Sequence, residues 1–226
     1  MRFYLSSPMN RLQAAAANGS PVLLSFASAG GSRWHDEYLP SYDRVLLDSG
    51  AYSELTTGVR IDLDRYVDWV QKFPWVDAWA GLDDITGDWH RSLQNYEKGG
   101  FPTIHDTDPI ALLNDLIPMA RERGGWIGVG LKPPRERKEG VVRDLLDRMP
   151  HDLHVHGWAL GRYAHLGRLD SVDSTNWFRD AWKLRTMPAL HHLTEAETLE
   201  IVVKRYQRRD RIPEQPSDQV GIWDRL

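Results

Sequence analysis

Two aspartates stand in similar surroundings far apart along the chain. Asp48 lies in "VLLDSGAYS" (45–53) and Asp173 in "SVDSTNW" (171–177), each after a short apolar run and before small or polar residues. Two carboxylates in one pocket suit covalent catalysis at a sugar carbon, where one attacks and the other handles the leaving group's proton. Either aspartate alone is as well explained as the cap of a turn. Together they favour one functional pocket.

Further acids and glycines follow other apolar runs. Asp83 and Asp84 are neighbours, so they point in opposite directions from a strand and only one should face a pocket. That carboxylate suits the N–H groups of a planar base, although a solvated turn or a helix cap explains it too. Gly128 and Gly130 let the backbone approach a flat ligand, but a tight turn gives the same spacing.

The histidines and basic residues leave alternatives open. His154 and His156 share one face of a strand and suit a divalent metal together with a further Asp or His, or else simple packing with one hydrogen bond. Basic runs at 132–138, 183–185 and 204–211 would hold phosphates if they flank the acidic residues, and are otherwise solvated helix faces.

Alternating strands and helices are needed to bring these residues together. The apolar runs predict strands at 21–28, 44–50, 77–84, 101–106, 126–132, 152–160 and 170–174, with helical patterns between most of them. Such alternation predicts a parallel sheet, and seven or eight units in 226 residues favour an α/β TIM-type (β/α)8 barrel, in which reactive residues gather at the carboxyl ends of the strands. The eighth strand is hardest to find, and "LRTMPAL" (184–190) is the best candidate. We expect one barrel domain over 1–212 and a surface arm over 213–226.

Composition narrows the function classes. The net charge of −4 gives no global signal for nucleic acid, and the absence of cysteine excludes disulfides, thiolate zinc sites and cysteine nucleophiles. There is no apolar run of membrane-spanning length and no dinucleotide-binding glycine motif. We expect a cytoplasmic protein with no membrane partner, metal or cofactor.

Four motifs in order resemble a known family. "LLDSGAYS", "GLDDITGD", "GWIGVGLK" and "HVHGWALG" followed by "SVDSTNW", spread over 45–182, are similar to segments of the tRNA-guanine transglycosylases. The resemblance is closer to their smaller phage relatives, the deazapurine DNA-modification transglycosylases. It implies a TIM-barrel enzyme that exchanges guanine in a nucleic acid for a 7-deazaguanine of the preQ0 type.

The resemblance also implies residue roles. Asp173 would be the nucleophile at C1′ and Asp48 the general acid and base. Asp83, with Asp84 as the second choice, would read the base edge, and His105 falls where the family has a polar contact to the base. The remaining candidates for substrate binding are Gly128 and Gly130 through their backbone, Tyr52 or a nearby tryptophan by stacking, and Ser49, Gly50, His156 and Gly157 at the strand ends.

One departure from the family bears on the substrate. Members that act on tRNA hold a structural zinc largely through cysteines in a C-terminal insertion, whereas this chain has no cysteine. DNA is therefore favoured over tRNA. Two other functions remain open: a metal-dependent hydrolase that uses His154 and His156, and a non-catalytic accessory protein that binds nucleic acid.

Overall fold

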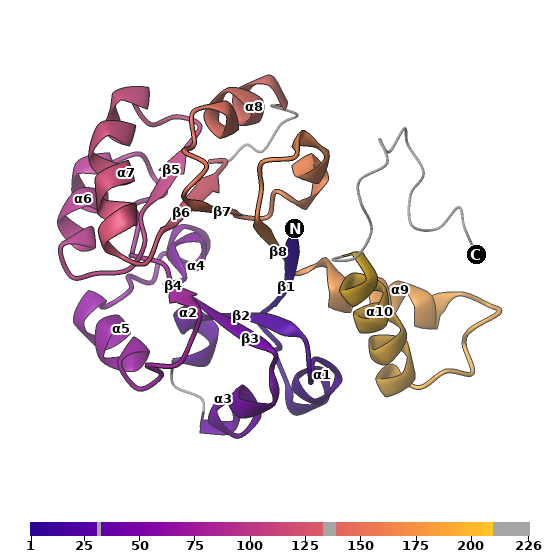
Figure 1. Cartoon of the computed structure of the whole chain (residues 1–226). Coiled ribbons are helices and arrows are strands. Elements are labelled where there is room, and N and C mark those ends of the chain that lie inside the picture. The colour runs from indigo at the N-terminus through magenta and orange to yellow at the C-terminus, as the bar shows by residue number, and fades with distance from the viewer. Residues whose placement is uncertain (31–32, 133–138, 210–226) are drawn as a thin grey trace.

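Eight parallel strands form a ring with helices around it. The computed structural model describes residues 1–30, 33–132 and 139–209, so the arm expected at 213–226 lies outside the described residues. The strands are β1 (Arg2–Ser6), β2 (Pro21–Ser25), β3 (Arg44–Asp48), β4 (Ala78–Trp79), β5 (Thr103–His105), β6 (Trp126–Gly130), β7 (His154–Gly157) and β8 (Ser171–Ser174). They are hydrogen-bonded in the order β4-β3-β2-β1-β8-β7-β6-β5, and a parallel bridge from Ala80 to Phe101 links the two ends (Figure 1). The predicted TIM-type barrel is confirmed.

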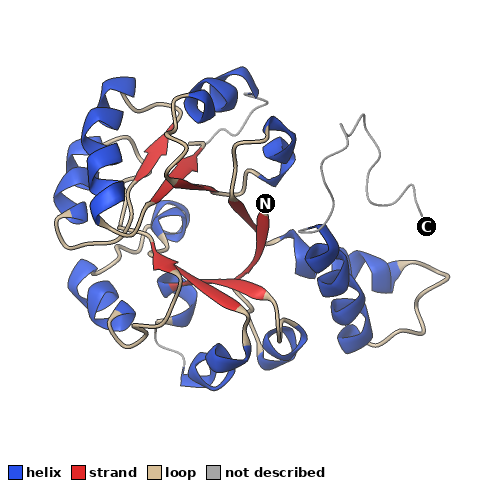
Figure 2. Ribbon diagram, in the orientation of Figure 1, coloured by secondary structure: helices blue, strands red, loops and turns tan. Residues whose placement is uncertain are grey.

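Helices lie on the outside of the ring, and all of them except α9 and α10, which follow β8, connect successive strands (Figure 2). They are α1 (Arg11–Ala16), α2 (Phe26–Ala29), α3 (Arg33–Tyr38), α4 (Ala51–Thr57), α5 (Leu63–Val70), α6 (Trp89–Tyr96), α7 (Leu113–Glu122), α8 (Glu139–Asp147), α9 (Asn176–Thr186) and α10 (Glu195–Arg209). Short 3-10 helices add η1 (Leu39–Ser41), η2 (Ile110–Leu112) and η3 (Gly161–Leu166). The helical patterns predicted between strands are present as α5 before β4, α6 before β5, α7 before β6 and α8 before β7.

The prediction of the last strand was wrong. Residues 184–186 belong to α9, which buries Trp177, Ala181 and Leu184 at helical spacing, and α9 packs beside α10. The strand that completes the ring is β1 at the start of the chain, which pairs with β2 on one side and β8 on the other. A five-residue strand followed by the polar "SSPMN" gives little periodicity from which to recognise it.

Two hydrophobic layers position the strands. Alternate side chains point outward against the helices, and the opposite set fills the ring with Tyr4, Leu23, Leu46, Ala80 and Phe101. Because a parallel strand in a barrel is covered on both faces, its sequence is apolar almost throughout, and the polar inward residues concentrate at the carboxyl end. In the part of the chain that the structure describes, no helix combines the length and apolar character needed to cross a bilayer.

Candidate active site

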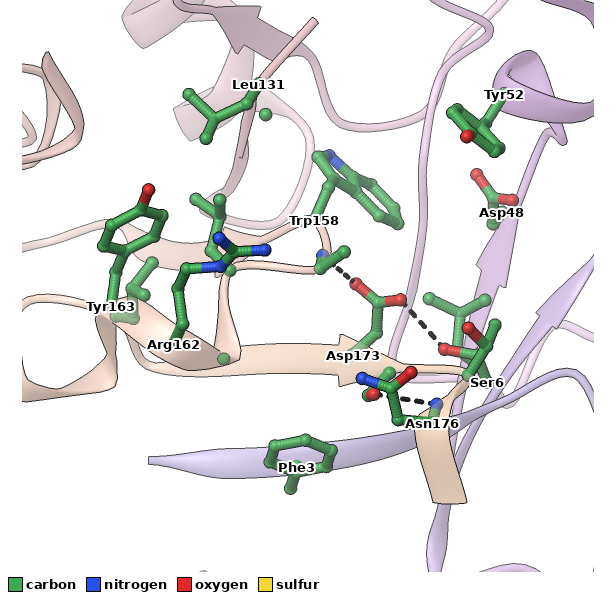
Figure 3. A pocket seen from close by; sticks show the side chains of 18 of the residues that line it. Phe3, Ser6, Asp48, Tyr52, Leu131, Trp158, Arg162, Tyr163, Asp173 and Asn176 are labelled. Atoms are coloured by element: carbon green, nitrogen blue, oxygen red, sulfur yellow. Dashed lines mark hydrogen bonds between the residues drawn. The ribbon is translucent and has the colours of Figure 1, made fainter. Parts of the chain in front are cut away.

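A cleft of about 1190 Å³ opens at the carboxyl ends of the strands. Asp48 ends β3, Asp83 follows β4 and Asp173 lies in β8, and all three carboxylates line this cleft. Figure 3 shows Asp48 and Asp173 in the same close view, with Ser6 near the latter. Residues 125 positions apart by number thus share one pocket, as the paired sequence contexts predict.

Asp173 is held as a carboxylate by two hydrogen bonds and by the nearby ring of His156. Its Oδ2 accepts from the Ser6 hydroxyl at 2.8 Å, and its Oδ1 accepts from the Ala159 backbone N–H at 2.7 Å. His156 Nε2 lies 3.6 Å from Oδ1. Burial alone would raise the pKa of Asp173, but His156, Ala159 and Ser6 together outweigh it and hold the pKa below its ordinary value. Asp173 is therefore ionised and fixed in place at neutral pH.

Asp48 is shifted in the opposite direction. Burial, followed by the charges of Asp83 and Asp173, raises the pKa of Asp48 to about 7, although the Ser25 hydroxyl and the Gly50 N–H oppose the rise. The Gly50 N–H donates to Asp48 Oδ2 at 3.1 Å. Near neutral pH this carboxyl both gives and takes a proton, which is the property of a general acid and base.

Asp83 faces the cleft and is held by an alternating chain of charges. His105 Nε2 lies 3.1 Å from Asp83 Oδ2, and its Nδ1 lies 3.4 Å from Asp108 Oδ2. Asp108 also pairs with the buried Lys132 at 2.8 Å. Burial would lower the pKa of His105, but Asp108 and Asp83 raise it to about 9, so this histidine is a cation between two anions. Both of its nitrogens are occupied by carboxylates, and it positions Asp83.

Asp84 points away from the cleft. Its carboxylate accepts from the Thr86 backbone N–H at 2.8 Å and from Arg91 at 2.8 Å. Burial tends to raise its pKa, but Thr86 and Arg91 bring the pKa below the ordinary value. Of the two adjacent acids, Asp83 is the one in the pocket, and Asp84 fixes the loop between β4 and α6.

Trp158 explains one of the two strand glycines. Its indole Nε1 donates to Thr103 Oγ1 at 3.0 Å, and its ring lies parallel to Phe101 at 6.0 Å between centroids. A Cβ on Gly128 would lie 2.4 Å from both Trp158 Nε1 and Thr103 Oγ1. Gly128 is thus small so that Trp158 can cross the barrel, whereas Gly130 lines the cleft itself.

The other candidates divide between the cleft and the layer beneath it. Gly50 and Tyr52 line the cleft, and Gly50 has a φ of +92° that favours glycine. Ser49 is fully buried, and its hydroxyl has no hydrogen-bond partner among the described residues. Gly157 packs under Leu160 and Leu169, where a Cβ would lie 2.9 Å from each. Ser49 and Gly157 therefore support the cleft from outside it.

His154 and His156 contact the same serine. Ser171 Oγ lies 2.8 Å from His154 Nε2 and 2.9 Å from His156 Nδ1. Among the residues 1–30, 33–132 and 139–209, no group of three or more His, Asp or Glu side chains is arranged to hold a metal ion. The pair that suggested a metal site is engaged with Ser171 instead.

Several residues of the site carried no sequence signal. Ser6 belongs to the unrecognised β1, the Ala159 contact is a backbone N–H, and Asp108 precedes Pro109 like an ordinary helix cap. The His-x-x-Asp spacing of His105 and Asp108 is a usable signal for this pair, since the Asp108 carboxylate also accepts from the His105 backbone N–H at 2.8 Å.

The shifted pKa of Asp48 predicts a stability effect. Because the folded state binds this proton up to about pH 7 and the unfolded chain only to about pH 4, stability falls as pH rises through that window. Asp48→Asn removes the buried charge and should stabilise the protein at pH 8 by about 2–4 kcal/mol, with little gain at pH 4. Thermal unfolding at both pH values checks this, and a less stable variant at pH 8 would contradict the assigned shift.

Fold and site together define a TIM-type barrel with a carboxylate-rich cleft. No model of a known protein family matches the chain, and no curated protein matches it. It is similar to a solved structure described as the native KDPGal structure, with 12% identity over 93% of this chain and 95% of that one and a TM-score of 0.45. It is also similar to the YdjI aldolase from Escherichia coli K12, with 8% identity over 93% and 90% and a TM-score of 0.40.

Proposed function

We propose that this chain is a base-exchange transglycosylase that replaces guanine in a nucleic acid, DNA more than tRNA, with a 7-deazaguanine. One observation carries the proposal: Asp48 and Asp173 share a cleft, and their pKa values are displaced in opposite directions. Two carboxyl groups whose pKa values differ in this way supply an ionised nucleophile and a protonated acid at the same pH. The order of motifs described above supports the same reaction.

In the first half of the reaction, a carboxylate oxygen of Asp173 forms a bond to C1′ of the target nucleotide. The C1′–N9 bond breaks, its electron pair goes to the guanine, and Asp48 gives the guanine a proton. The result is a sugar esterified to Asp173, a free neutral guanine and an ionised Asp48.

In the second half, a 7-deazaguanine takes the place of guanine. Asp48 accepts the N9 proton of the incoming base, N9 bonds to C1′, and the ester electrons return to Asp173. Asp83 accepts from the N–H groups on the edge of either base, since it lines the cleft and His105 contacts it through Oδ2. Tyr52 and Trp158, which also line the cleft, offer aromatic faces for a base extruded from its strand.

A basic side of the cleft suits a polymer better than a free nucleoside. Arg162 from η3 and Arg179 and Lys183 from α9 line the same cleft as the three acids, and Arg162 is visible in Figure 3. Of the basic runs noted in the sequence, 183–185 thus contributes to the cleft, whereas 133–138 lies outside the described residues. Phosphates on either side of the target nucleotide would lie against these cations.

Charge reversal on this side should weaken binding of single-stranded DNA. Arg179→Glu with Lys183→Glu is expected to cost about tenfold or more in affinity at low salt and to lower the salt dependence by roughly one unit of slope per lost contact. Fluorescence anisotropy over a salt series measures both. The charge-matched control is Arg121→Glu with Arg148→Glu, on exposed residues of α7 and the turn after α8. Equal losses of DNA affinity in the two double variants would contradict the contact assigned to Arg179 and Lys183.

The decisive experiment is incubation of the full chain with labelled guanine and either DNA or tRNA. Incorporation into DNA that requires Asp173 supports the proposal, and incorporation into neither polymer overturns it. A stoichiometric divalent ion bound at His154 and His156 would favour the hydrolase. Tight DNA binding without a covalent adduct would favour the accessory protein.

A further inference from the structure

A row of polar side chains inside the barrel, joined by two hydrogen bonds, leads toward the carboxylate of Asp173. His154 Nε2 lies 2.8 Å from Ser171 Oγ, which lies 2.9 Å from His156 Nδ1, and His156 Nε2 faces Asp173 Oδ1 at 3.6 Å. Ser171 and His156 are fully buried. Since Ser171 and Asp173 are two residues apart on β8, and His154 and His156 two apart on β7, all four point into the ring.

The chemistry of the three side chains determines which of them donates each hydrogen bond. A carboxylate only accepts, so His156 carries a hydrogen on Nε2, and in the neutral ring Nδ1 is then an acceptor. Ser171 has a single hydroxyl hydrogen, which it gives to His156 Nδ1. The Ser171 oxygen therefore accepts from His154, whose hydrogen must be on Nε2.

The surroundings of His154 keep it neutral and in place. Burial, with smaller effects of His156 and Arg2, lowers the pKa of His154 to about 4, although Asp170 and Asp77 oppose the shift. Its ring stacks on Trp126 at 3.7 Å between centroids. A neutral His154 with hydrogen on Nε2 fits the donor that Ser171 requires.

We propose that His154, Ser171 and His156 are positioning residues that fix the tautomer of His156, so that its Nε2–H is always directed at Asp173. The tautomer itself is a property of the fold, whereas its effect on rate rests on the proposed function. Without the Ser171 hydroxyl, His156 can move its hydrogen to Nδ1, which places a lone pair against the carboxylate. The same arrangement explains why two histidines lie on the same face of β7. A metal could bind them only if both gave up their contact with Ser171.

Nitrogen NMR of the full chain labelled with ¹⁵N-histidine tests the tautomer directly. At neutral pH, His156 should be protonated on Nε2 and bare on Nδ1, with its signals assigned from their loss in His156→Gln. Ser171→Ala should change this pattern toward the Nδ1–H form or an average of the two. The matched control is Ser20→Ala, since Ser20 is also fully buried and accepts one side-chain bond, from Gln207 at 2.7 Å, outside the cleft.

Single-turnover kinetics of adduct formation tests the consequence. Ser171→Ala should slow the reaction about 10- to 100-fold, as expected for weakening a donor to a charged group. Its acid limb should move to higher pH, because Asp173 would keep the donors Ser6 and Ala159 but would no longer face the Nε2–H of His156. Ser20→Ala should keep the wild-type rate and pH profile.

The outcomes separate this proposal from the one on which it rests. A wild-type His156 bare on Nε2, a doubly protonated His156, or a pattern unchanged in Ser171→Ala would each overturn the positioning chain. If the wild-type protein forms no adduct but the tautomers are as described, the transglycosylase assignment fails. The positioning role of His154, Ser171 and His156 is then retained. A slower Ser171→Ala with an unmoved acid limb would indicate a packing role and also overturn the proposal.

Discussion

Replacing Asp173 with asparagine is expected to eliminate the covalent adduct and to reduce base exchange by a factor of about 10⁴ or more, as for other nucleophiles removed from a concerted site. An amide cannot form the ester to C1′. The fold should survive, since asparagine has the same shape and its oxygen still accepts from Ser6 or Ala159. Trapping of enzyme-bound DNA on a denaturing gel and release of labelled guanine measure the loss, and Asp173→Ala should be equally inactive.

The control for Asp173 is a carboxylate outside the cleft. Asp152 pairs with Arg121 on the surface, so Asp152→Asn should leave the exchange rate unchanged. Circular dichroism and thermal unfolding of Asp173→Asn show whether the fold is retained. A folded Asp173→Asn protein that still exchanges guanine at the wild-type rate would rule out this residue as nucleophile.

Asp48→Asn should have the second-largest effect on activity. Without a proton donor for the departing guanine, adduct formation is expected to slow by about 10²- to 10⁴-fold. In the wild-type protein the protonated form of Asp48 is present below about pH 7, so adduct formation should fall as pH rises through that value. The return step needs the ionised form and should rise over the same range.

The pH profile distinguishes the role of Asp48 from general damage to the site. Rapid-mixing measurements of adduct formation from pH 5.5 to 8.5 should show the falling limb near 7 in the wild-type protein and no such limb in Asp48→Asn. A variant that is more stable at pH 8 and yet nearly inactive would show that the buried charge is kept for chemistry at the expense of stability. The same falling limb in both proteins would assign it to another group.

The sequence indicated the strand-end acids but not the groups that tune them. Asp48 and Asp173 were recognisable because each breaks an apolar run at its end, a purely local feature. Against the effect of burial, His156, Ala159 and Ser6 lower the pKa of Asp173, whereas burial and the charge of Asp83 raise the pKa of Asp48; these groups lie on other elements or act through the backbone. No periodicity in a single sequence reports such contacts.

The missed strand has a similar cause. The ring-completing strand was sought at 184–190, because β1 is short and its pairing depends on β8 at the other end of the chain. His105 lines the cleft, where its contact with a base stays a prediction, and its two nitrogens face Asp83 and Asp108. Gly128 lies against Trp158, a contact that no local pattern in the sequence indicates.

The position of β1 has a consequence for synthesis of the protein. The register pairs Tyr4 with Asp173, and the bond from Ser6 to Asp173 spans 167 residues. On the ribosome, a growing chain can pair β1 with β2 early, but the other edge of β1 stays open until β8 has emerged. Incomplete chains therefore lack the hydrogen bond from Ser6 to Asp173, and this side of the cleft is assembled only after β8 has been synthesised.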